Sequence, residues 1–328
     1  MSVDTISPIG QVRDDGRTAR EVLFDDAAPS WQSRCVNGLL RLLPIKKQLA
    51  SAAAVQEHVR KLALRPASHE PTGLGRGIDV TLESVAGWPV YHTAPSANPG
   101  TGNVVLFLHG GGFINEIVRA HWRFVGYLTR EAQVRCVVPI YPLVPRATAK
   151  DIVPGTGELL RKLLEEIEPA KVTVAGNSAG AGLALAAAQW LRDSGHRQPN
   201  RLVLISPGVN AQVNRPEQIA LAARDPVQDI PGIIEAGRLY AGDLDVAHPY
   251  VSPLNGDFRG LAPMLVFSGT LDLLYPDSID LAAKARAAGV PIELHLRRGQ
   301  PRNYAGLPTP EGREARAVIV RAVAGGSH

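Results

Sequence analysis

The sequence predicts an α/β fold with a mostly parallel central sheet covered by helices on both faces. From about residue 103 onward, short continuous apolar runs alternate with segments in which apolar residues recur at helical spacing. Strands buried on both faces read as continuous apolar runs, and helices are the usual connections between parallel strands. The 328 residues are 45% hydrophobic and 20% charged, which is typical of a globular protein and excludes a disordered chain.

The amino-terminal part predicts helices after a flexible start. Residues 1–24 are mostly polar, and we expect them to be flexible. Between residues 25 and 65, apolar residues recur at helical spacing. This pattern predicts one helix over 31–49 and a second over 52–64, separated by a polar joint at 48–51.

The expected core runs from residue 78 to residue 324, after a linker rich in Pro and Gly. Alternating residues predict two strands around Gly87, at 78–85 and 88–92. Six further strands are expected at 104–108, 134–140, 172–175, 202–205, 264–267 and 292–296. Helices are expected at about 119–132, 155–167, 179–194, 276–288 and 311–324. Residues 211–245 break this rhythm and predict a helical insertion, and residues 325–328 resemble an affinity-tag remnant.

Charge and cysteine content exclude several classes of protein. The 35 basic and 31 acidic residues give a net charge of +4 without a dense basic run, so no nucleic-acid partner is expected. Cys35 and Cys136 are too few and too distant for a disulfide framework. The amino terminus lacks the apolar segment of a signal peptide, which favours a cytoplasmic location. Residues 172–191 carry no charge, but their change of periodicity favours a strand and a helix over a membrane span.

A nucleophile motif follows the strand expected at 172–175. Residues 176–180 read Gly-Asn-Ser-Ala-Gly, which fits G-x-S-x-G, and a helix rich in Ala and Leu comes next. In this context a serine sits on a strained turn, where larger neighbours would meet the adjoining strand and helix. We therefore expect Ser178 to be a nucleophile. The alternative is a serine in an ordinary glycine-rich turn.

Three consecutive glycines follow an apolar strand, in the sequence His-Gly-Gly-Gly at 109–112. Backbone N–H groups approach a small negative centre closely where no side chain intervenes. We expect the N–H groups of Gly111, Gly112 and Ala179 to form an oxyanion hole, with His109 bracing the loop. A phosphate-binding loop is the competing interpretation, but the lysine of that motif is missing.

These motifs together resemble those of bacterial carboxylesterases in the hormone-sensitive-lipase-like branch of the α/β hydrolases. Other segments occur in the order of that family: Tyr-Pro-Leu-Val-Pro at 141–145, Ser-Pro at 206–207, the stretch 248–254 and Leu-Ala-Pro at 261–263. The resemblance runs from about residue 100 to residue 324. It implies an α/β-hydrolase fold with a helical cap, which would be formed here by residues 25–65 and 211–245.

The resemblance also implies the acid and the base of a catalytic triad. Gly-Thr-Leu-Asp at 269–272 matches the family's acid motif, so Asp272 would orient the base. The family's histidine falls in the segment Gly-Gln-Pro-Arg at 299–302, and Arg302 occupies its position. A guanidinium only donates hydrogen bonds and cannot accept the serine proton.

The sequence offers poor substitutes for these two residues. Asp277 and Asp280 are rivals of Asp272, but they lie deeper in the following helix. Of the remaining histidines, we expect only His295 or His248 to be able to reach the site.

Arg302 has two interpretations. In the first, the chain is an esterase whose base was replaced to trap a substrate, and the tag-like end supports this. In the second, it is a natural non-catalytic relative that binds a ligand in the former pocket. The plant gibberellin receptors, which share the fold and lack the histidine, resemble this second case.

The expected parent reaction is ester hydrolysis through an acyl-enzyme, without a metal or a cofactor. With arginine at position 302 the activity of this chain should be severely reduced.

The expected partner is a small hydrophobic ester or lactone. The whole chain also resembles bacterial zearalenone lactonases, which implies a resorcylic macrolactone as substrate. Homodimers are frequent in the family, but no sequence feature decides the oligomeric state. Candidate walls of the substrate pocket are Trp31, Leu39, Ile233, Ile234 and Tyr240.

Overall fold

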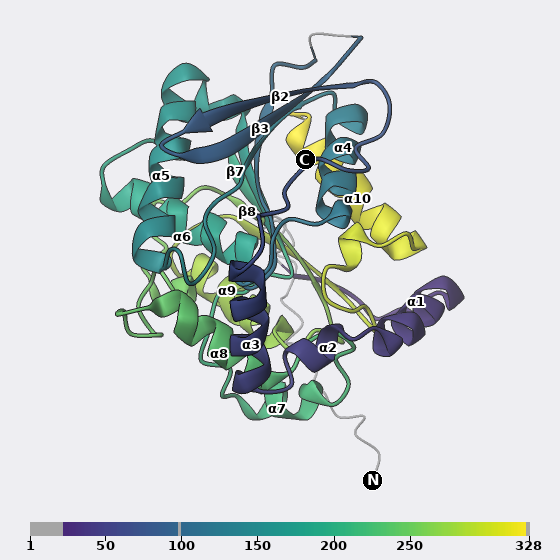
Figure 1. Ribbon diagram of the computed structural model, residues 1–328. Helices are drawn as coiled ribbons and strands as arrows, with labels where there is room; N and C mark the ends of the chain where they lie inside the picture. Colours follow the sequence, from purple (N-terminus) through teal and green to yellow (C-terminus); the bar gives the residue numbers. More distant parts are fainter. Residues whose placement is uncertain (1–21, 98–99, 326–328) are drawn as a thin grey trace.

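The computed structural model describes residues 22–97 and 100–325, and within them nine strands form one sheet (Figure 1). The strands are β1 (Val22–Asp25), β2 (Ile78–Val85), β3 (Trp88–Pro95), β4 (Val104–Leu108), β5 (Arg135–Pro139), β6 (Val172–Asn177), β7 (Arg201–Ile205), β8 (Met264–Gly269) and β9 (Ile292–Arg297). Their order is β1-β9-β8-β7-β6-β4-β5-β3-β2. From β1 to β5 in this order all neighbours are parallel, whereas β3 and β2 are antiparallel additions. The predicted fold class is confirmed.

Helices cover both faces of the sheet. They are α1 (Trp31–Leu42), α2 (Ile45–Gln48), α3 (Ala52–Ala63), α4 (Arg119–Glu131), α5 (Ala149–Glu166), α6 (Ala179–Asp193), α7 (Pro216–Ala222), α8 (Ile230–Ala241), α9 (Tyr275–Ala287) and α10 (Pro310–Val323). Short 3₁₀ turns occur at η1 (Pro169–Lys171), η2 (Pro253–Asn255) and η3 (Tyr304–Gly306). One apolar cluster lies between the sheet and α5, α6 and α9, and another lies under α4 and α10. The two clusters place these helix groups on opposite faces of the sheet, as Figure 1 also shows.

The start of the described chain corrects an expectation. Residues 22–24 were expected in a flexible segment, but they belong to β1, which pairs in parallel with β9. Val22 and Phe24 are of types with high strand propensity, and β9 would otherwise leave its backbone groups unpaired at the sheet edge. The rest of the expected flexible segment, residues 1–21, lies outside the described residues, as do residues 326–328 of the expected tag remnant.

The helix expected over 31–49 is two helices, because Pro44 interrupts it. Leu43, directly before the proline, is extended with φ −75° and ψ 146°. A residue that precedes proline is disfavoured in the helical conformation, so α1 ends there and α2 starts after it. The insertion at 211–245 is likewise two helices, α7 and α8, with a loop between them.

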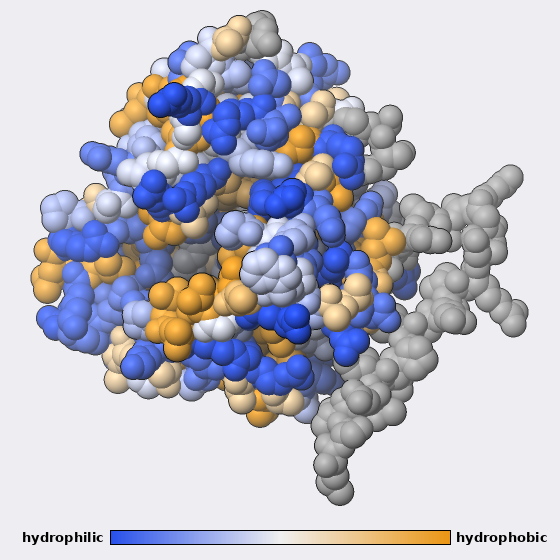
Figure 2. Space-filling view, turned by 90° about the vertical axis from the view of Figure 1, so that its right-hand side faces the viewer, coloured by the Kyte–Doolittle hydropathy of each residue, from blue (hydrophilic) through white to orange (hydrophobic). Residues whose placement is uncertain are grey.

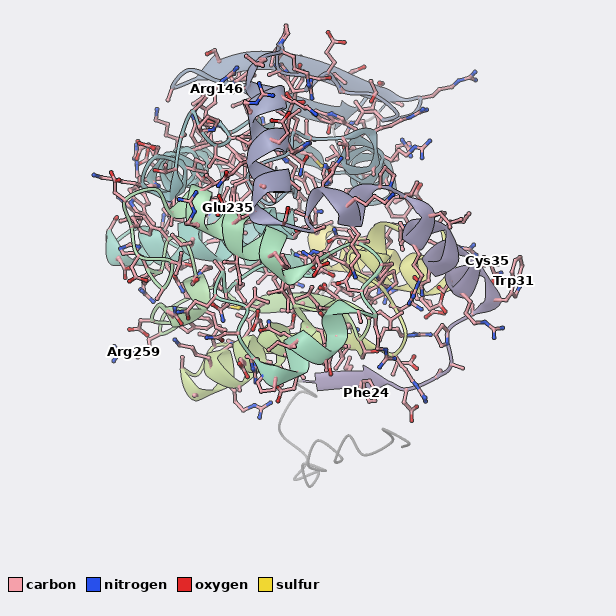
Figure 3. All side chains as sticks on the ribbon, turned by 60° about the horizontal axis from the view of Figure 1, so that its bottom comes forward. Phe24, Trp31, Cys35, Arg146, Glu235 and Arg259 are labelled. Atoms are coloured by element: carbon pink, nitrogen blue, oxygen red, sulfur yellow. The ribbon has the colours of Figure 1, made fainter. Side chains whose placement is uncertain are left out.

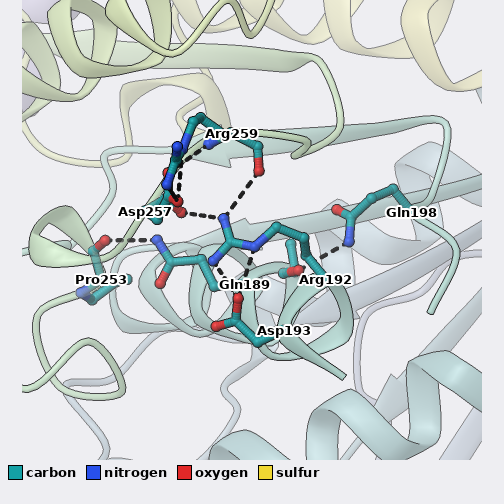
Figure 4. A network of polar contacts seen from close by, with 8 residues as sticks. Gln189, Arg192, Asp193, Gln198, Pro253, Asp257 and Arg259 are labelled. Atoms are coloured by element: carbon teal, nitrogen blue, oxygen red, sulfur yellow. Dashed lines mark hydrogen bonds and ion pairs between the residues drawn. The ribbon is translucent and has the colours of Figure 1, made fainter. Parts of the chain in front are cut away.

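Helix α6 is anchored at its carboxyl-terminal end by a polar network (Figure 4). Gln189 donates to the carbonyl of Pro253 at 2.8 Å, and Arg192 donates to the carbonyl of Arg259 at 3.1 Å. The side chain of Arg192 also donates to the backbone of Asp257. These bonds hold α6 against the loop that precedes β8.

The lengths of the helices and the distribution of apolar side chains on one face of the molecule can be compared with those of a membrane span. Among the residues that the structure describes, no helix is long and apolar enough to cross a membrane. On the face of Figure 2, hydrophobic side chains occur in separate small groups among hydrophilic ones. The uncharged stretch at 172–191 forms β6 and most of α6, as the sequence predicts.

Candidate active site

Ser178 sits on a strained turn between β6 and α6. Its φ is 56°, in the left-handed region that side chains rarely adopt. The turn is held at both ends of the residue: Ser178 N donates to Ile205 O at 2.9 Å, and Gly208 N donates to Ser178 O at 3.0 Å. Strain of this kind persists only where the surroundings enforce it, and it is common at functional sites.

The neighbouring glycines allow the close packing that this turn requires. A Cβ on Gly176 would lie 2.4 Å from Gly180 O, and a Cβ on Gly180 would lie 2.1 Å from Leu108 O. Neither distance is tolerable for a carbon atom, so both positions require glycine. The amino terminus of α6 is thereby brought against the carboxyl ends of the neighbouring strands.

The glycine loop at 109–112 lies beside this turn. Gly110 N donates to the side-chain oxygen of Asn177 at 2.9 Å, which joins the loop to the residue before Ser178. Gly111 has φ 133°, and a Cβ there would lie 2.5 Å from Asn115 O. Gly111, Gly112 and Ala179 all line the cavity that contains Ser178. The N–H of Ala179 has no partner within its own helix, because it belongs to the first turn.

His109 lies behind the loop and does not line this cavity. Its ring stacks on Tyr141 with centroids 4.4 Å apart, and its Nδ1 lies 2.7 Å from Gly110 O. Burial lowers the pKa of His109 to about 4, so the ring is neutral near pH 7. The position agrees with the predicted bracing role.

Arg302 joins Ser178 to Asp272. Its Nη1 donates to both carboxylate oxygens of Asp272, at 2.9 and 3.0 Å. Its Nη2 donates to Ser178 Oγ at 2.8 Å, and its Nε lies 3.3 Å from the same oxygen. The side chains of Arg302 and Asp272 are only 4% and 1% exposed, so this is a buried ion pair. The structure thus brings together the three residues that the sequence analysis singles out.

The loop that carries Arg302 is fixed by its backbone. Asn303 has φ 58° in the left-handed region, and its N–H donates to Ser206 Oγ at 2.8 Å. Leu271 N donates to Gln300 O at 2.9 Å, which joins this loop to the one carrying Asp272. A Cβ on Gly269 would lie 2.3 Å from Gln300 O, so the two loops meet at a glycine.

The rivals of Asp272 are engaged elsewhere. Asp277 accepts from Gln218 Nε2 at 3.1 Å, and burial raises its pKa to about 7. Asp280 pairs with Arg215 at the start of α7.

The two histidines considered as substitute bases do not line the cavity. The ring of His295 stacks on Phe267, and its Nε2 lies 2.5 Å from Glu293 Oε1. His248 Nδ1 accepts the N–H of Tyr250 at 3.1 Å. Neither histidine therefore reaches the cavity, and both remain the poor substitutes for a base that the sequence indicates.

The segment that carries these residues matches a known protein family. A family model described as the alpha/beta hydrolase fold matches residues 105–305, which contain Ser178, Asp272, Arg302 and the glycine loop. The chain belongs to the α/β-hydrolase fold family.

Curated relatives of this α/β hydrolase are named as lipases and esterases. A triacylglycerol lipase of Mycobacterium tuberculosis is 32% identical over 83% of this chain and 61% of its own length. An acetyl-hydrolase of Streptomyces hygroscopicus is 33% identical over 58% of this chain and 64% of its own length. The chain thus spans less than two thirds of the length of both relatives.

Solved structures resemble this chain over most of its length. An esterase of the bacterial hormone-sensitive lipase family is 26% identical, with a TM-score of 0.76 over 91% of this chain and 99% of the other. The structure of EstE5 is 27% identical, with a TM-score of 0.77 over 90% and 98%. These neighbours support the resemblance to the hormone-sensitive-lipase-like branch.

The cavity beside Ser178 has a volume of about 290 Å³ and extends to the segments expected as a cap. Ile233 and Tyr240 of α8 line it, as the sequence suggests. The other three candidate wall residues, Trp31, Leu39 and Ile234, are exposed and do not line it. Trp31 lies at the periphery of the molecule on α1, next to Cys35 (Figure 3).

Two segments of the expected cap contact each other over this cavity. Gln56 of α3 donates to the carboxylate of Glu235 on α8 at 2.7 Å, and Figure 3 shows where Glu235 lies on α8. Lys46 of α2 donates to the backbone oxygen of Asp225 at 2.9 Å, in the loop between α7 and α8. Among the described residues, no three His, Cys, Asp or Glu side chains are grouped so that they could hold a metal ion.

Asp225 is a residue that sequence reasoning missed. Its carboxylate is buried and accepts the N–H groups of Val227, Gln228 and Leu273, at 2.8, 2.9 and 2.8 Å. Burial, and then the charge of Asp272, raises its pKa to about 6. The only sequence signal is an acidic residue before a short loop, which is too common to indicate a buried position.

His121 is the second missed residue, since the sequence analysis dismissed it as a base. It lies in the first turn of α4 and lines the cavity together with Asn177 and Ser178. Burial lowers its pKa to about 3, so its ring is neutral.

Proposed function

We propose that this chain carries the serine ester hydrolase site of the hormone-sensitive-lipase-like esterases, with its activity severely reduced by Arg302. The observation that carries the proposal is the buried contact of Arg302 with both Asp272 and Ser178. In an active triad a histidine at this place accepts the serine proton and is oriented by the acid. Arg302 occupies the position of that base without being able to accept a proton.

The expected reaction begins with attack of Ser178 Oγ on an ester carbonyl. The N–H groups of Gly111, Gly112 and Ala179 would hold the oxyanion, in a site that lies at the amino terminus of α6. Arg302 donates to Ser178 Oγ and cannot accept a proton, so the proton of Ser178 has no base at this position to receive it. The chain should keep at most the roughly 10³–10⁴-fold acceleration that an oxyanion hole and binding provide without the triad.

The substrate proposed is a small hydrophobic ester or lactone. Apolar side chains such as Ile45, Leu49, Ile233 and Leu274 line the cavity, which suits an apolar acyl or alcohol group. The names of the relatives, among them lipase, esterase and acetyl-hydrolase, support the ester class. A resorcylic macrolactone such as zearalenone is the most specific candidate, and it rests on whole-chain resemblance alone.

A second candidate function is ligand binding without catalysis. The ion pair of Arg302 and Asp272 satisfies both buried charges, so the site is complete as a rigid pocket without a base. We also propose that residues 25–65 and 211–245 act as the cap over this pocket in either case.

Hydrolysis of p-nitrophenyl butyrate by this chain and by Arg302→His tests the proposal. We expect the variant to gain a factor of 10³ or more in kcat/KM. Arg302→Gln, which supplies neither base nor charge, serves as the control and should gain nothing. A silent Arg302→His variant that still binds a ligand would favour the second function. Ring opening of zearalenone by Arg302→His tests the specific substrate separately.

A further inference from the structure

Two backbone donors fix the orientation of two polar side chains in the cavity wall. Gly110 N–H donates to Asn177 Oδ1 at 2.9 Å, so the Nδ2 end of this amide must point the other way. Val118 N–H donates to His121 Nδ1 at 3.1 Å, so this nitrogen carries no proton. A neutral imidazole carries its single proton on one nitrogen, which is therefore Nε2 in His121.

The result is a pair of donors that face each other. His121 Nε2 lies 3.4 Å from Asn177 Nδ2, and both atoms carry hydrogen. They cannot bond to each other, and reversing either group would set N–H against the N–H of Gly110 or of Val118. At this separation a single acceptor placed between them can receive from both and satisfy the pair.

The pair lies close to the nucleophile. The position that a Cβ on Gly110 would take is 2.7 Å from Asn177 Nδ2 and 3.0 Å from Ser178 Cβ. His121, Asn177 and Ser178 line one cavity. An oxygen that accepts from the pair therefore belongs to the part of a ligand within a few bonds of the carbonyl at Ser178.

We propose that His121 Nε2–H and Asn177 Nδ2 form a subsite for a second oxygen of the substrate, an ether or carbonyl oxygen near the reacting carbonyl. The substrate class is thus an ester or lactone with an additional oxygen acceptor. This inference rests on the proposed ester hydrolase function, because only that function makes the ligand a substrate. The subsite itself concerns binding alone.

The subsite should select ligands with an oxygen at this position, because leaving the two N–H donors unpaired costs binding free energy. Water satisfies such a pair in a resting site, and a ligand oxygen can take its place with similar bonds. A methylene group at the same position would displace the water and leave both donors unpaired. Discrimination between oxygen and methylene is therefore the measurable property of the subsite.

The test uses two ketones that cannot be hydrolysed and differ in one atom, 4-methoxy-2-butanone and 2-hexanone. Their dissociation constants are measured by NMR titration of the chain as it stands. The quantity compared is the ratio of the two constants in each variant, since this removes the difference in hydration between the ligands. A net hydrogen bond of about 1 kcal/mol corresponds to about a fivefold change in this ratio.

Two isosteric variants separate the subsite from the structural role of His121. In His121→Asn the amide oxygen replaces Nδ1 and keeps the bond to Val118 N–H, while the Nε2 donor is lost. In His121→Gln the amide nitrogen can replace Nε2, while the bond to Val118 is lost. We expect the preference for the ether to fall about fivefold in His121→Asn and to persist in His121→Gln.

The opposite result, with selectivity unchanged in His121→Asn, would overturn the subsite and leave His121 a structural role only. A ¹⁵N spectrum that places the proton of His121 on Nδ1 would also overturn it. Neither measurement needs turnover, so a failure of the esterase proposal remains distinguishable from a failure of this one.

Discussion

The carboxylate of Asp225 accepts a hydrogen bond from the backbone N–H of Leu273 at 2.8 Å. Leu273 is the residue that directly follows Asp272 in the chain. Asp225 belongs to the loop between α7 and α8, and Leu273 follows β8. One buried hydrogen bond therefore joins the loop between α7 and α8 to the loop that carries Asp272. The two aspartates are close enough for the charge of Asp272 to contribute to the raised pKa of Asp225.

This contact predicts a pH dependence of stability. The pKa of Asp225 is raised in the folded protein to about 6, above its ordinary value of 3.8. Protonated Asp225 therefore stabilises the folded state. This contribution to the unfolding free energy is fully present below about pH 4 and is lost as the pH rises through 6. We expect Asp225→Asn to remove about 3 kcal/mol of this pH-dependent change in unfolding free energy. Urea unfolding at pH 4 and pH 7.5 measures it, with exposed Asp243→Asn as the control that should leave the change intact.

The buried pair of Arg302 and Asp272 predicts strong coupling in stability. Arg302→Leu leaves the Asp272 carboxylate buried without a partner and should lower the unfolding free energy by about 3–5 kcal/mol. The double variant Arg302→Leu/Asp272→Leu removes both charges and should recover most of that loss. A double-mutant cycle by urea unfolding measures the coupling. Additive losses in the double variant would contradict it.

Two glycine substitutions should change the unfolding free energy in opposite directions. Gly180→Ala places a Cβ 2.1 Å from Leu108 O, so the backbone beneath Ser178 must shift, and we expect severe destabilisation. Gly38→Ala in α1 meets no atom within 4 Å. It should raise the unfolding free energy by about 0.5–1 kcal/mol, since alanine is the better helix former. Thermal unfolding of both variants decides whether close packing at Gly180 is as tight as described.

The ring and the hydroxyl of Tyr240 should contribute differently to the unfolding free energy. Its ring stacks on Phe113 of the glycine loop with centroids 3.5 Å apart, and its buried hydroxyl has no hydrogen-bond partner among the described residues. Tyr240→Phe should therefore leave the unfolding free energy unchanged or raise it. Tyr240→Ala should cost about 3–5 kcal/mol through the lost stack and the cavity. A loss in Tyr240→Phe as large as in Tyr240→Ala would show that the hydroxyl is bonded.

Much of the core could be predicted because its signals are local. Each parallel strand is a short apolar run, and the strand–turn–helix around Ser178 places that residue without knowledge of tertiary contacts. Helix α5 was predicted to start at 155, after Pro154, but it begins at Ala149. Asp151 accepts the N–H of Thr148 at 3.0 Å, so a capping contact extends the helix through the proline.

The missed features depend on contacts between distant segments. β1 exists because β9 offers an edge 272 residues later, with Val22 opposite Leu294. The donor pair of His121 and Asn177 depends on the N–H groups of Val118 and Gly110, whose directions are fixed only in the folded chain. Sequence spacing carries no information about either arrangement.

The pairing of β1 with β9 makes the amino-terminal strand a mechanical support of the loop that carries Arg302. Asp25 O accepts the N–H of Arg298 at 2.9 Å, and Asp25 also pairs with the side chain of Arg297 at 2.6 Å. Only three residues lie between Arg298 and Arg302 along the chain. Force applied to the strand at 22–25, by a fused domain or a surface attachment, would therefore reach the loop beside Ser178. An attachment at the far edge of the sheet, on β2, would leave that loop undisturbed.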